Sequence, residues 1–241
     1  MSGPILEVRG VEQRFGPFQA LGPVDLVLHR GERLGIIGPN GSGKTTLINC
    51  ISGTLRPQQG RVVFDGVDVT DLPPHRRARM GLSRSFQIPK PFTGMTVLEN
   101  LLVPIDQISP SADAEDRALA VLESVGLQRR AGHEAGGLSQ LELRKLELAR
   151  ALVVEPKVLV ADEAMAGLSE GEIDDVLAIL THLSATGIAV IMIEHIMHAV
   201  MRFSTRIVCF ETGRTIADAA PDVIAADPLV QKVYFGEQTR H

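Results

Sequence analysis

The segment GPNGSGKTT, residues 38–46, has the residue types and spacing of a loop that binds phosphate groups. It satisfies the pattern G-x-x-x-x-G-K-[ST] and follows the apolar run LGIIG, residues 34–38, which is typical of a buried strand. Glycines let the backbone approach a phosphate closely, so that successive N–H groups and the start of a following helix can point at its oxygens. We expect Lys44 to reach the outer phosphates of a nucleotide and the Thr45 hydroxyl to bind Mg²⁺. The predicted binding residues are Gly38, Pro39, Asn40, Gly41, Ser42, Gly43, Lys44, Thr45 and Thr46.

Two acidic residues end a second apolar run, VLVADE at residues 158–163. A phosphate site with a bound metal needs an acidic group, and Asp162 is placed to hold Mg²⁺ through a water molecule. Glu163, the next residue, is placed to polarise an attacking water as a general base. An acidic pair can also simply mark the end of a strand, but the presence of the Lys44 loop disfavours that interpretation.

His195 follows a third apolar run, IAVIMI at residues 188–193. A histidine here could donate a hydrogen bond to the terminal phosphate of a nucleotide, whereas a single histidine at a strand end is more often structural. With His198 it forms an i, i+3 pair, yet the neighbouring sequence offers no third metal ligand. The phosphate contact and the structural role both stay open on these residues alone.

The spacing of apolar residues predicts two kinds of strand. Alternation, typical of strands with one buried face, predicts a small antiparallel sheet near the N-terminus from residues 5–11, 24–29 and 61–66. Continuous apolar runs, typical of strands buried on both faces, occur at residues 34–38, 158–161, 188–193 and 206–210. Because helical patterns separate the last three runs, we expect an α/β fold with a parallel, doubly wound core.

Residues between the first strands and VLVADE have a helical pattern instead. Thr96 with Glu99, and Ser139 with Glu142, have the spacing of capping boxes, each of which marks a helix start. No repeats or low-complexity tracts interrupt the chain. We therefore expect one domain of residues 1–241, made of an α/β core with the antiparallel sheet at 1–87 and 154–241, and an inserted all-helical subdomain at 88–153.

Composition and charge narrow the class of protein. A net charge of −5 and an aromatic content of 4% argue against nucleic-acid binding, which needs a clustered basic face. The four arginines of PPHRRARMGLSR, residues 73–84, fit a solvated helix face better. No run approaches the ~20 apolar residues of a membrane span, and the first residues lack the hydrophobic region of a signal peptide. Cys50 and Cys209 lie outside any metal-type spacing and fit buried thiols in a reducing compartment.

From about residue 5 to residue 236, the order of the motifs resembles that of the ATP-binding subunits of ABC transporters. GPNGSGKTT is similar to the Walker A loop, VLVADE to the Walker B motif with its catalytic glutamate, and His195 to the switch histidine. The resemblance makes Gln87, in RSFQIPKPF, the Q-loop glutamine, with a catalytic and a Mg²⁺-binding role. It places Phe15 where the family stacks an aromatic ring on adenine, although a Phe before a Gly could equally lie in the core. It implies a P-loop, RecA-like core that takes ATP and Mg²⁺.

Within that family, RSFQIPKPFTGMTVLENLLV, IEHIMHAVM and VYFGE resemble the subgroup that takes up branched-chain amino acids, whose relatives carry urea and short amides. The resemblance implies an ATPase that powers an importer, bound to two transmembrane permease subunits and served indirectly by a solute-binding protein. It also implies a peripheral location on the cytoplasmic face of the inner (plasma) membrane and no nucleic-acid partner. Two alternatives stay open: a regulatory cassette that binds ATP without hydrolysing it, and a soluble ABC ATPase without a transport role.

The signature motif departs from the family pattern. Alignment on LARAL places LSQLE, residues 138–142, where most members have LSGGQ, the motif that contacts the nucleotide of the other subunit in a dimer. Ser139 is retained and is expected to donate across the dimer, whereas Gln140 and Leu141 add side chains where a close phosphate favours glycine. A Ser139 hydroxyl used for capping is not free for a phosphate. We expect the site that uses this motif to turn over slowly, which favours a heterodimer with a second ATPase subunit; a homodimer is the alternative.

Overall fold

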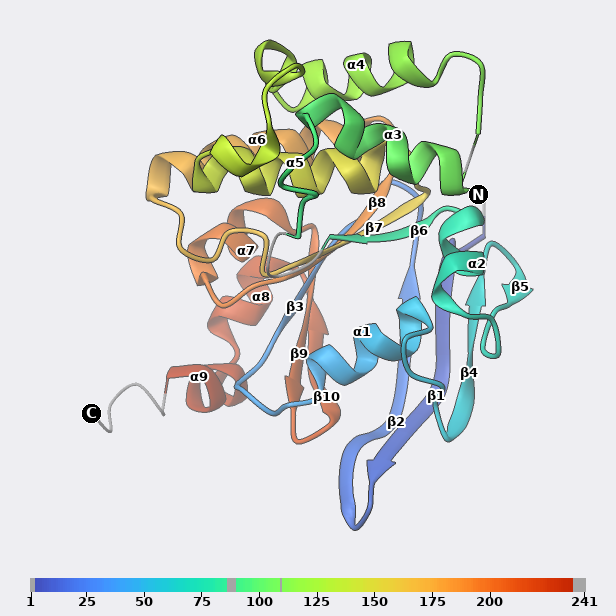
Figure 1. Cartoon of the computed structure of the whole chain (residues 1–241). Helices are drawn as coiled ribbons and strands as arrows, with labels where there is room; N and C mark the ends of the chain where they lie inside the picture. Colours follow the sequence, from blue (N-terminus) through green and yellow to red (C-terminus); the bar gives the residue numbers. More distant parts are fainter. Residues whose placement is uncertain (1–2, 86–89, 109, 236–241) are drawn as a thin grey trace.

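The computed structural model describes residues 3–85, 90–108 and 110–235, which form two sheets with helices around them (Figure 1). The first sheet is antiparallel and has the order β2-β1-β4-β5. Its strands are β1 (Leu6–Phe15), β2 (Phe18–Leu28), β4 (Gln59–Phe64) and β5 (Val67–Asp68). Leu6 of β1 pairs with Leu28 on one side and with Phe64 on the other. The predicted antiparallel sheet near the N-terminus is confirmed.

The second sheet has the order β10-β9-β3-β8-β7-β6. Its strands are β3 (Arg33–Ile37), β6 (Leu82–Ser85), β7 (Val158–Asp162), β8 (Ala189–Ile193), β9 (Arg206–Glu211) and β10 (Arg214–Ala219). The predicted parallel core is confirmed: β3, β7, β8 and β9 are parallel, and β6 pairs parallel with β7. Strand β10, which was not predicted, follows a turn at Thr212 and Gly213 and pairs antiparallel with β9. Strand β6 was not predicted, because its sequence LSRS has no apolar run.

Helices cover both faces of the second sheet (Figure 1). Helix α1 (Lys44–Ser52) follows β3, and α2 (Pro74–Arg79) precedes β6. The next group is α3 (Val97–Ile108), α4 (Ala114–Ser124), the 3₁₀ turns η1 (Gln128–Arg130) and η2 (Ala135–Gly137), and α5 (Gln140–Leu152). The last group is α6 (Glu170–Ala185), α7 (Met197–Phe203), α8 (Pro221–Ala226) and α9 (Pro228–Phe235). The subdomain limits at 88 and 153 stay a prediction. Over the ranges described, no helix combines the length and apolar character needed to cross a membrane.

Both capping boxes form as the sequence predicts. The Ser139 hydroxyl oxygen accepts from the Glu142 amide at 3.2 Å, and the Ser139 amide donates to the Glu142 carboxylate at 2.8 Å. At the start of α3, the Thr96 amide donates to the Glu99 carboxylate at 2.7 Å. Because these contacts satisfy N–H groups that have no partner inside the helix, they define where α3 and α5 begin.

Alternate residues of the central strands pack into two different hydrophobic cores. Val158 and Val160 of β7 pack with the antiparallel sheet and α1, whereas Leu159 and Ala161 pack with the helices from α3 to α7. Successive side chains of a strand point to opposite faces, so both sets are buried. This arrangement explains why β7 is apolar at each of these positions, and it directs the two acidic residues that follow to the carboxyl end of the sheet.

The prediction of a solvated helix face for the four arginines of residues 73–84 is wrong for two of them. Arg77 is 1% exposed. Its Nη1 donates to the carbonyl oxygens of Cys50 and Ile51 at 2.7 and 2.6 Å, at the end of α1. Arg84 lies on β6, where its side chain is also largely buried. The sequence of a short helix and a short strand does not reveal which carbonyl or carboxylate groups lie opposite them.

Candidate functional site

The loop between β3 and α1 is shaped by three glycines with positive φ. The values are 151° at Gly38, 77° at Gly41 and 104° at Gly43. A Cβ at Gly38 would lie 2.3 Å from the carbonyl oxygen of Phe210, and one at Gly43 would lie 2.6 Å from that of Ala20. A Cβ at Gly41 would meet nothing within 4 Å. Two glycines are therefore required by close packing under the loop, while the third faces open space.

Lys44 is held inside this loop. Its Nζ donates to the carbonyl oxygens of Gly38 at 2.6 Å and Pro39 at 2.9 Å, and the residue is 6% exposed. Burial lowers the pKa of Lys44, and the negative charges of Glu163 and Asp162 act in the opposite direction. The ammonium is thus placed where an anion can replace the carbonyl oxygens as its partner, as the sequence predicts for a phosphate.

A pocket of about 220 Å³ opens over the loop. It brings the loop and α1 together with two residues that follow β7 and β8, Glu163 and His195. Phe15 and Phe18, on either side of the turn between β1 and β2, are 51% and 58% exposed, so the alternative of a core position for Phe15 is wrong. The lining residues are Phe15, Phe18, Ala20, Asn40, Gly41, Ser42, Gly43, Lys44, Thr45, Thr46, Glu163, Ile193 and His195.

Phe18 is a lining residue that the sequence interpretation missed. It stands three residues after Phe15 in RFGPF, and the intervening Gly16 has φ 58°, which allows the tight turn. The sequence signal that could have identified Phe18 is a pair of phenylalanines on either side of one turn. Both side chains present a flat apolar surface, which suits stacking on an aromatic ligand.

Ser42 tests whether the pocket fits a phosphate group. Its hydroxyl oxygen is buried and has no hydrogen-bond partner among the described residues. A buried hydroxyl without a partner is costly, and a phosphate oxygen at the loop would supply the missing acceptor. The first N–H groups of α1, which a helix cannot satisfy internally, lie at the same place. The loop therefore has the donors that a bound phosphate requires.

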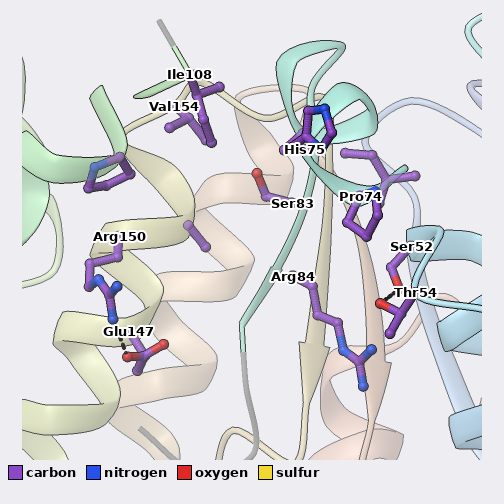
Figure 2. A pocket seen from close by; sticks show the side chains of 14 residues that line it. Ser52, Thr54, Pro74, His75, Ser83, Arg84, Ile108, Glu147, Arg150 and Val154 are labelled. Carbon is purple, nitrogen blue, oxygen red and sulfur yellow. Dashed lines mark hydrogen bonds and ion pairs between the residues drawn. The ribbon is translucent and has the colours of Figure 1, made fainter. Parts of the chain in front are cut away.

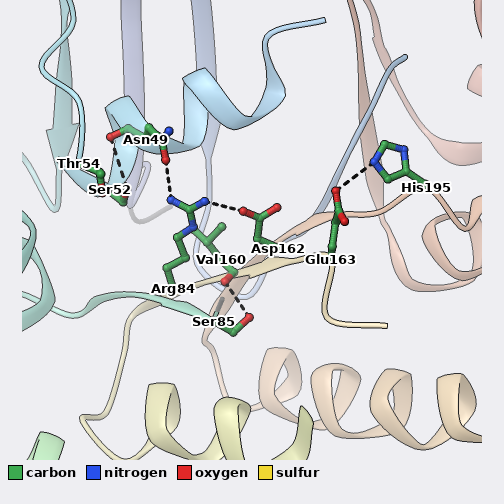
Figure 3. A network of polar contacts seen from close by, with 9 residues as sticks. All are labelled: Asn49, Ser52, Thr54, Arg84, Ser85, Val160, Asp162, Glu163 and His195. Carbon is green, nitrogen blue, oxygen red and sulfur yellow. Dashed lines mark hydrogen bonds and ion pairs between the residues drawn. The ribbon is translucent and has the colours of Figure 1, made fainter. Parts of the chain in front are cut away.

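Glu163 and His195, which both line the pocket, point toward each other (Figure 3). The Glu163 Oε1 and His195 Nε2 atoms are 3.2 Å apart. Glu163 has φ 49°, a left-handed conformation that is uncommon outside glycine, and its amide donates to the carbonyl oxygen of Ile193 at 2.9 Å. The strained backbone and this bond to the end of β8 turn the carboxylate toward the loop. His195 is thus paired with an acid, and the metal pair with His198 finds no support.

Asp162 is paired with Arg84 (Figure 3). The Arg84 Nη2 atom lies 2.6 Å from Asp162 Oδ2, and Nη1 donates to Asn49 Oδ1 of α1 at 2.8 Å. Asp162 itself is not among the pocket-lining residues. Sequence interpretation missed Arg84, because nothing in LSRS marks a partner for a carboxylate that is 78 residues away.

The remaining predicted residues lie elsewhere. Gln87 lies outside the described residues. Ser139 is exposed at the start of α5 and does not line the pocket. Within residues 3–85, 90–108 and 110–235, no group of three His, Cys, Asp or Glu side chains is arranged to hold a metal ion. Thr45, which lines the pocket, has a hydroxyl oxygen, and Asp162 has a carboxylate. Both are oxygen ligands of the kind that suits Mg²⁺, which binds few protein oxygens and keeps waters and phosphate oxygens as its other ligands.

The family described as ABC transporter matches residues 21–166, more than half of the chain. The chain belongs to this family. Among relatives of this family member, the high-affinity branched-chain amino acid transport ATP-binding protein BraF of Pseudomonas aeruginosa is 38% identical over 255 residues, which cover 98% of this chain and 100% of BraF. The protein of the same description from Escherichia coli strain K12, LivG, is 38% identical over 256 residues, with the same coverage.

Solved cassettes have the same architecture as this family member. An ATP-binding cassette of an ABC transporter in its ADP conformation superposes with a TM-score of 0.90 at 34% identity, covering 98% of this chain and 100% of that chain. A nucleotide-free ATP-binding cassette superposes with a TM-score of 0.88 at 33% identity, covering 96% and 98%. The expected α/β cassette fold is confirmed.

Proposed function

We propose that this chain binds and hydrolyses ATP as the cassette subunit of an ABC importer for branched-chain amino acids or related amides. The observation that carries the hydrolysis is the pocket in which the Lys44 loop, Glu163 and His195 meet. The 38% identity with branched-chain amino acid transport ATP-binding proteins, along 98% of this chain, supports the cargo class.

Several residues of the pocket, together with Asp162 and Gln87, have a proposed role in hydrolysis. The N–H groups of the loop, with Lys44 and the Ser42 hydroxyl, bind and orient the phosphates, and Phe15 stacks on adenine. Thr45, Asp162 through water and Gln87 would hold Mg²⁺, which would supply positive charge to the phosphate oxygens. Glu163 accepts a proton from the attacking water, and His195 donates to the terminal phosphate.

The signature motif supports a dimer with unequal sites. We place Ser139 opposite the nucleotide bound by a second ATPase subunit, because it is exposed at the start of α5 and away from this chain's own pocket. Gln140 and Leu141 put side chains at the same helix end, so the site that uses them turns over slowly. A different partner subunit with an intact signature then completes the faster site on this chain's own loop. A homodimer in which Ser139 and the Leu141 amide suffice is the alternative.

A second pocket supports docking to permease subunits. It has a volume of about 300 Å³ and lies where β6 runs between α5 on one side and α1 and α2 on the other (Figure 2). Its wall includes apolar side chains such as Ile108 and Val154, with Arg84 and the Glu147–Arg150 ion pair, which is 2.7 Å long. We propose that a segment of one permease subunit binds here. The chain would then lie at the cytoplasmic face of the inner (plasma) membrane, with a solute-binding protein acting on the permeases.

The test of the importer is reconstitution of the purified complex in lipid vesicles, with ATP supplied on the side of this chain. ATP-dependent accumulation of labelled leucine, isoleucine or valine, or of a short amide, supports the proposal. Accumulation that does not depend on ATP contradicts it. Affinity purification from native membranes provides the partners: two permeases and a second cassette are expected, and a bound nucleic acid without permeases would favour the soluble ABC ATPase.

The degenerate signature permits one second candidate, a regulatory cassette that binds ATP without hydrolysing it. Steady-state turnover separates the two functions. The regulatory cassette predicts that the complex hydrolyses ATP equally well when Glu163 of this chain is replaced by Gln, whereas the importer ATPase predicts a large loss. Equilibrium binding of ATP is expected in both cases and serves as the control for folding.

A further inference from the structure

Side chains from α5 donate hydrogen bonds to the segment that follows Glu163. The Ala166 carbonyl oxygen accepts from Gln140 Nε2 at 3.3 Å and from Arg144 Nη2 at 3.1 Å. Gln140 and Arg144 stand four residues apart, so they lie on one face of the helix. Both therefore act on the same carbonyl group, three residues after Glu163.

The same segment is also held from β8. The Met165 amide donates to Glu194 Oε1 at 2.9 Å, and Glu194 is 2% exposed. Arg144 is 7% exposed, and its positive charge attracts Glu194 and Glu163. Residues 165 and 166 are thus fixed from two directions, by the end of β8 and by the first turns of α5. A buried network of this kind positions its members strongly.

Gly167 shows that the segment is fitted to the Gln140 side chain. Its φ is 80°, and a Cβ at this position would lie 2.5 Å from Gln140 Nε2. The amide of Gln140 thus packs directly over a glycine. Gln140 stands where the usual LSGGQ motif has its first glycine. A glycine at residue 140 would have no side chain to contact Ala166 or Gly167.

We propose that Gln140 and Arg144 are positioning residues for Glu163 of their own chain. This inference rests on the proposed function. In the proposed dimer, the start of α5 faces the partner's nucleotide. The Gln140 and Arg144 side chains connect this end of α5 to the segment that contains Glu163, this chain's own general base. A displacement of α5 by the partner is then passed to residues 163–167, which couples the two nucleotide sites through Gln140.

Hydrogen exchange of the full-length chain tests the contact without any assay of activity. Gln140→Ala removes the side chain, and Gln140→Glu keeps its shape but replaces the donor to the Ala166 carbonyl by an acceptor. Both are expected to speed exchange of the amides at 163–168 about 2- to 10-fold, the effect of losing a net hydrogen bond. Lys145→Ala is the matched control: it breaks the 3.3 Å ion pair from α5 to Asp175 of α6 and leaves the segment untouched. Exchange rates at 163–168 equal to those of the wild type in both Gln140 variants would overturn the inference.

Turnover in the assembled complex tests the coupling. In a complex whose partner cassette lacks its own catalytic glutamate, hydrolysis occurs at the site of this chain alone. Gln140→Ala is expected to lower kcat at that site with the KM for ATP unchanged, because Gln140 does not touch the loop or the phenylalanines. Loss of turnover only in the reciprocal complex, which has Glu163→Gln in this chain and an intact partner, would show that Gln140 acts through the signature alone. A complex without any ATPase activity would refute the proposed function, and the exchange experiment would still decide the role of Gln140.

Discussion

Arg84 and Asp162 form a largely buried ion pair, with Arg84 Nη2 2.6 Å from Asp162 Oδ2 and side chains 15% and 10% exposed. The same guanidinium bonds Asn49 of α1. One side chain therefore joins β6, β7 and the helix that follows the phosphate-binding loop. Arg84 also lines the pocket proposed for the permease, so it touches both the docking region and the acidic end of β7 (Figures 2 and 3).

Replacement of Arg84 by Ala is expected to lower the free energy of unfolding by about 3 kcal/mol, because a buried carboxylate loses its partner. Chemical denaturation of the purified chain measures the effect. Arg129→Ala, at an exposed arginine of η1, is the control and should be close to neutral. An Arg84→Ala protein as stable as this control would show that Asp162 does not depend on the pair.

The glycines of the loop are expected to tolerate substitution unequally. Gly38→Ala places a Cβ against the Phe210 carbonyl oxygen, which is part of the backbone and cannot move away. Gly41→Ala meets open space and carries only the cost of a left-handed alanine, about 1 kcal/mol. Thermal unfolding should therefore rank Gly38→Ala well below Gly41→Ala, and the reverse order would contradict the packing described for the loop.

Ser139→Ala is expected to lower the free energy of unfolding by about 1 kcal/mol, because α5 loses its cap. Ser139→Thr retains a hydroxyl and should lose much less. Equal stability of the Ala and Thr variants would argue against the cap.

The capping geometry also bears on the conflict that the sequence predicted between capping and donation to a phosphate. The Ser139 oxygen accepts from the Glu142 amide, and accepting a bond does not use the hydroxyl hydrogen. Capping and donation to a phosphate are therefore chemically compatible.

Glu194 is expected to make stability fall as the pH rises. Burial raises the pKa of Glu194 to about 7, with the Glu163 charge adding to the effect and the Met165 amide and Arg144 opposing it. Between the ordinary pKa of 4.5 and about 7 the folded protein holds a proton that the unfolded chain has lost. Stability from this group is thus complete below pH 4.5 and lost above pH 7, a total of about 3 kcal/mol.

Denaturation of Glu194→Gln at several pH values checks this prediction. Gln can still accept from the Met165 amide, and it has no charge to desolvate. The stability of the variant relative to the wild type should rise between pH 5 and pH 8, and a difference that does not change with pH would contradict the assignment.

The sequence predicted those parts of the site that depend on local chemistry. The 38–46 loop needs glycines and a lysine in a fixed order, and the starts of α3 and α5 need a hydroxyl three residues before a glutamate. Such requirements are satisfied within a few residues, so a pattern can reveal them. The position of Glu163 and His195 also followed from the sequence, because the carboxyl ends of adjacent parallel strands β7 and β8 lie together.

Contacts between distant segments could not be predicted in this way. Arg84 meets Asp162 and Arg77 meets the end of α1 only because the fold brings their elements together. In the sequence, Arg77 and Arg84 look like ordinary surface charges. From the sequence, Gln140 was interpreted only as a side chain in place of a glycine of the signature motif. The structure shows that this side chain contacts Ala166 and Gly167.

The most direct test of the central claim is ATP hydrolysis by the assembled complex with Glu163→Gln in this chain. Loss of a general base at this chain's own site should reduce the rate by at least about tenfold, while equilibrium binding of ATP is retained. Glu123→Gln, at an exposed glutamate near the end of α4, should leave the rate unchanged. Hydrolysis and transport that stay above half of the wild-type rates in the Glu163→Gln complex would contradict the claim that this chain carries the competent ATPase site.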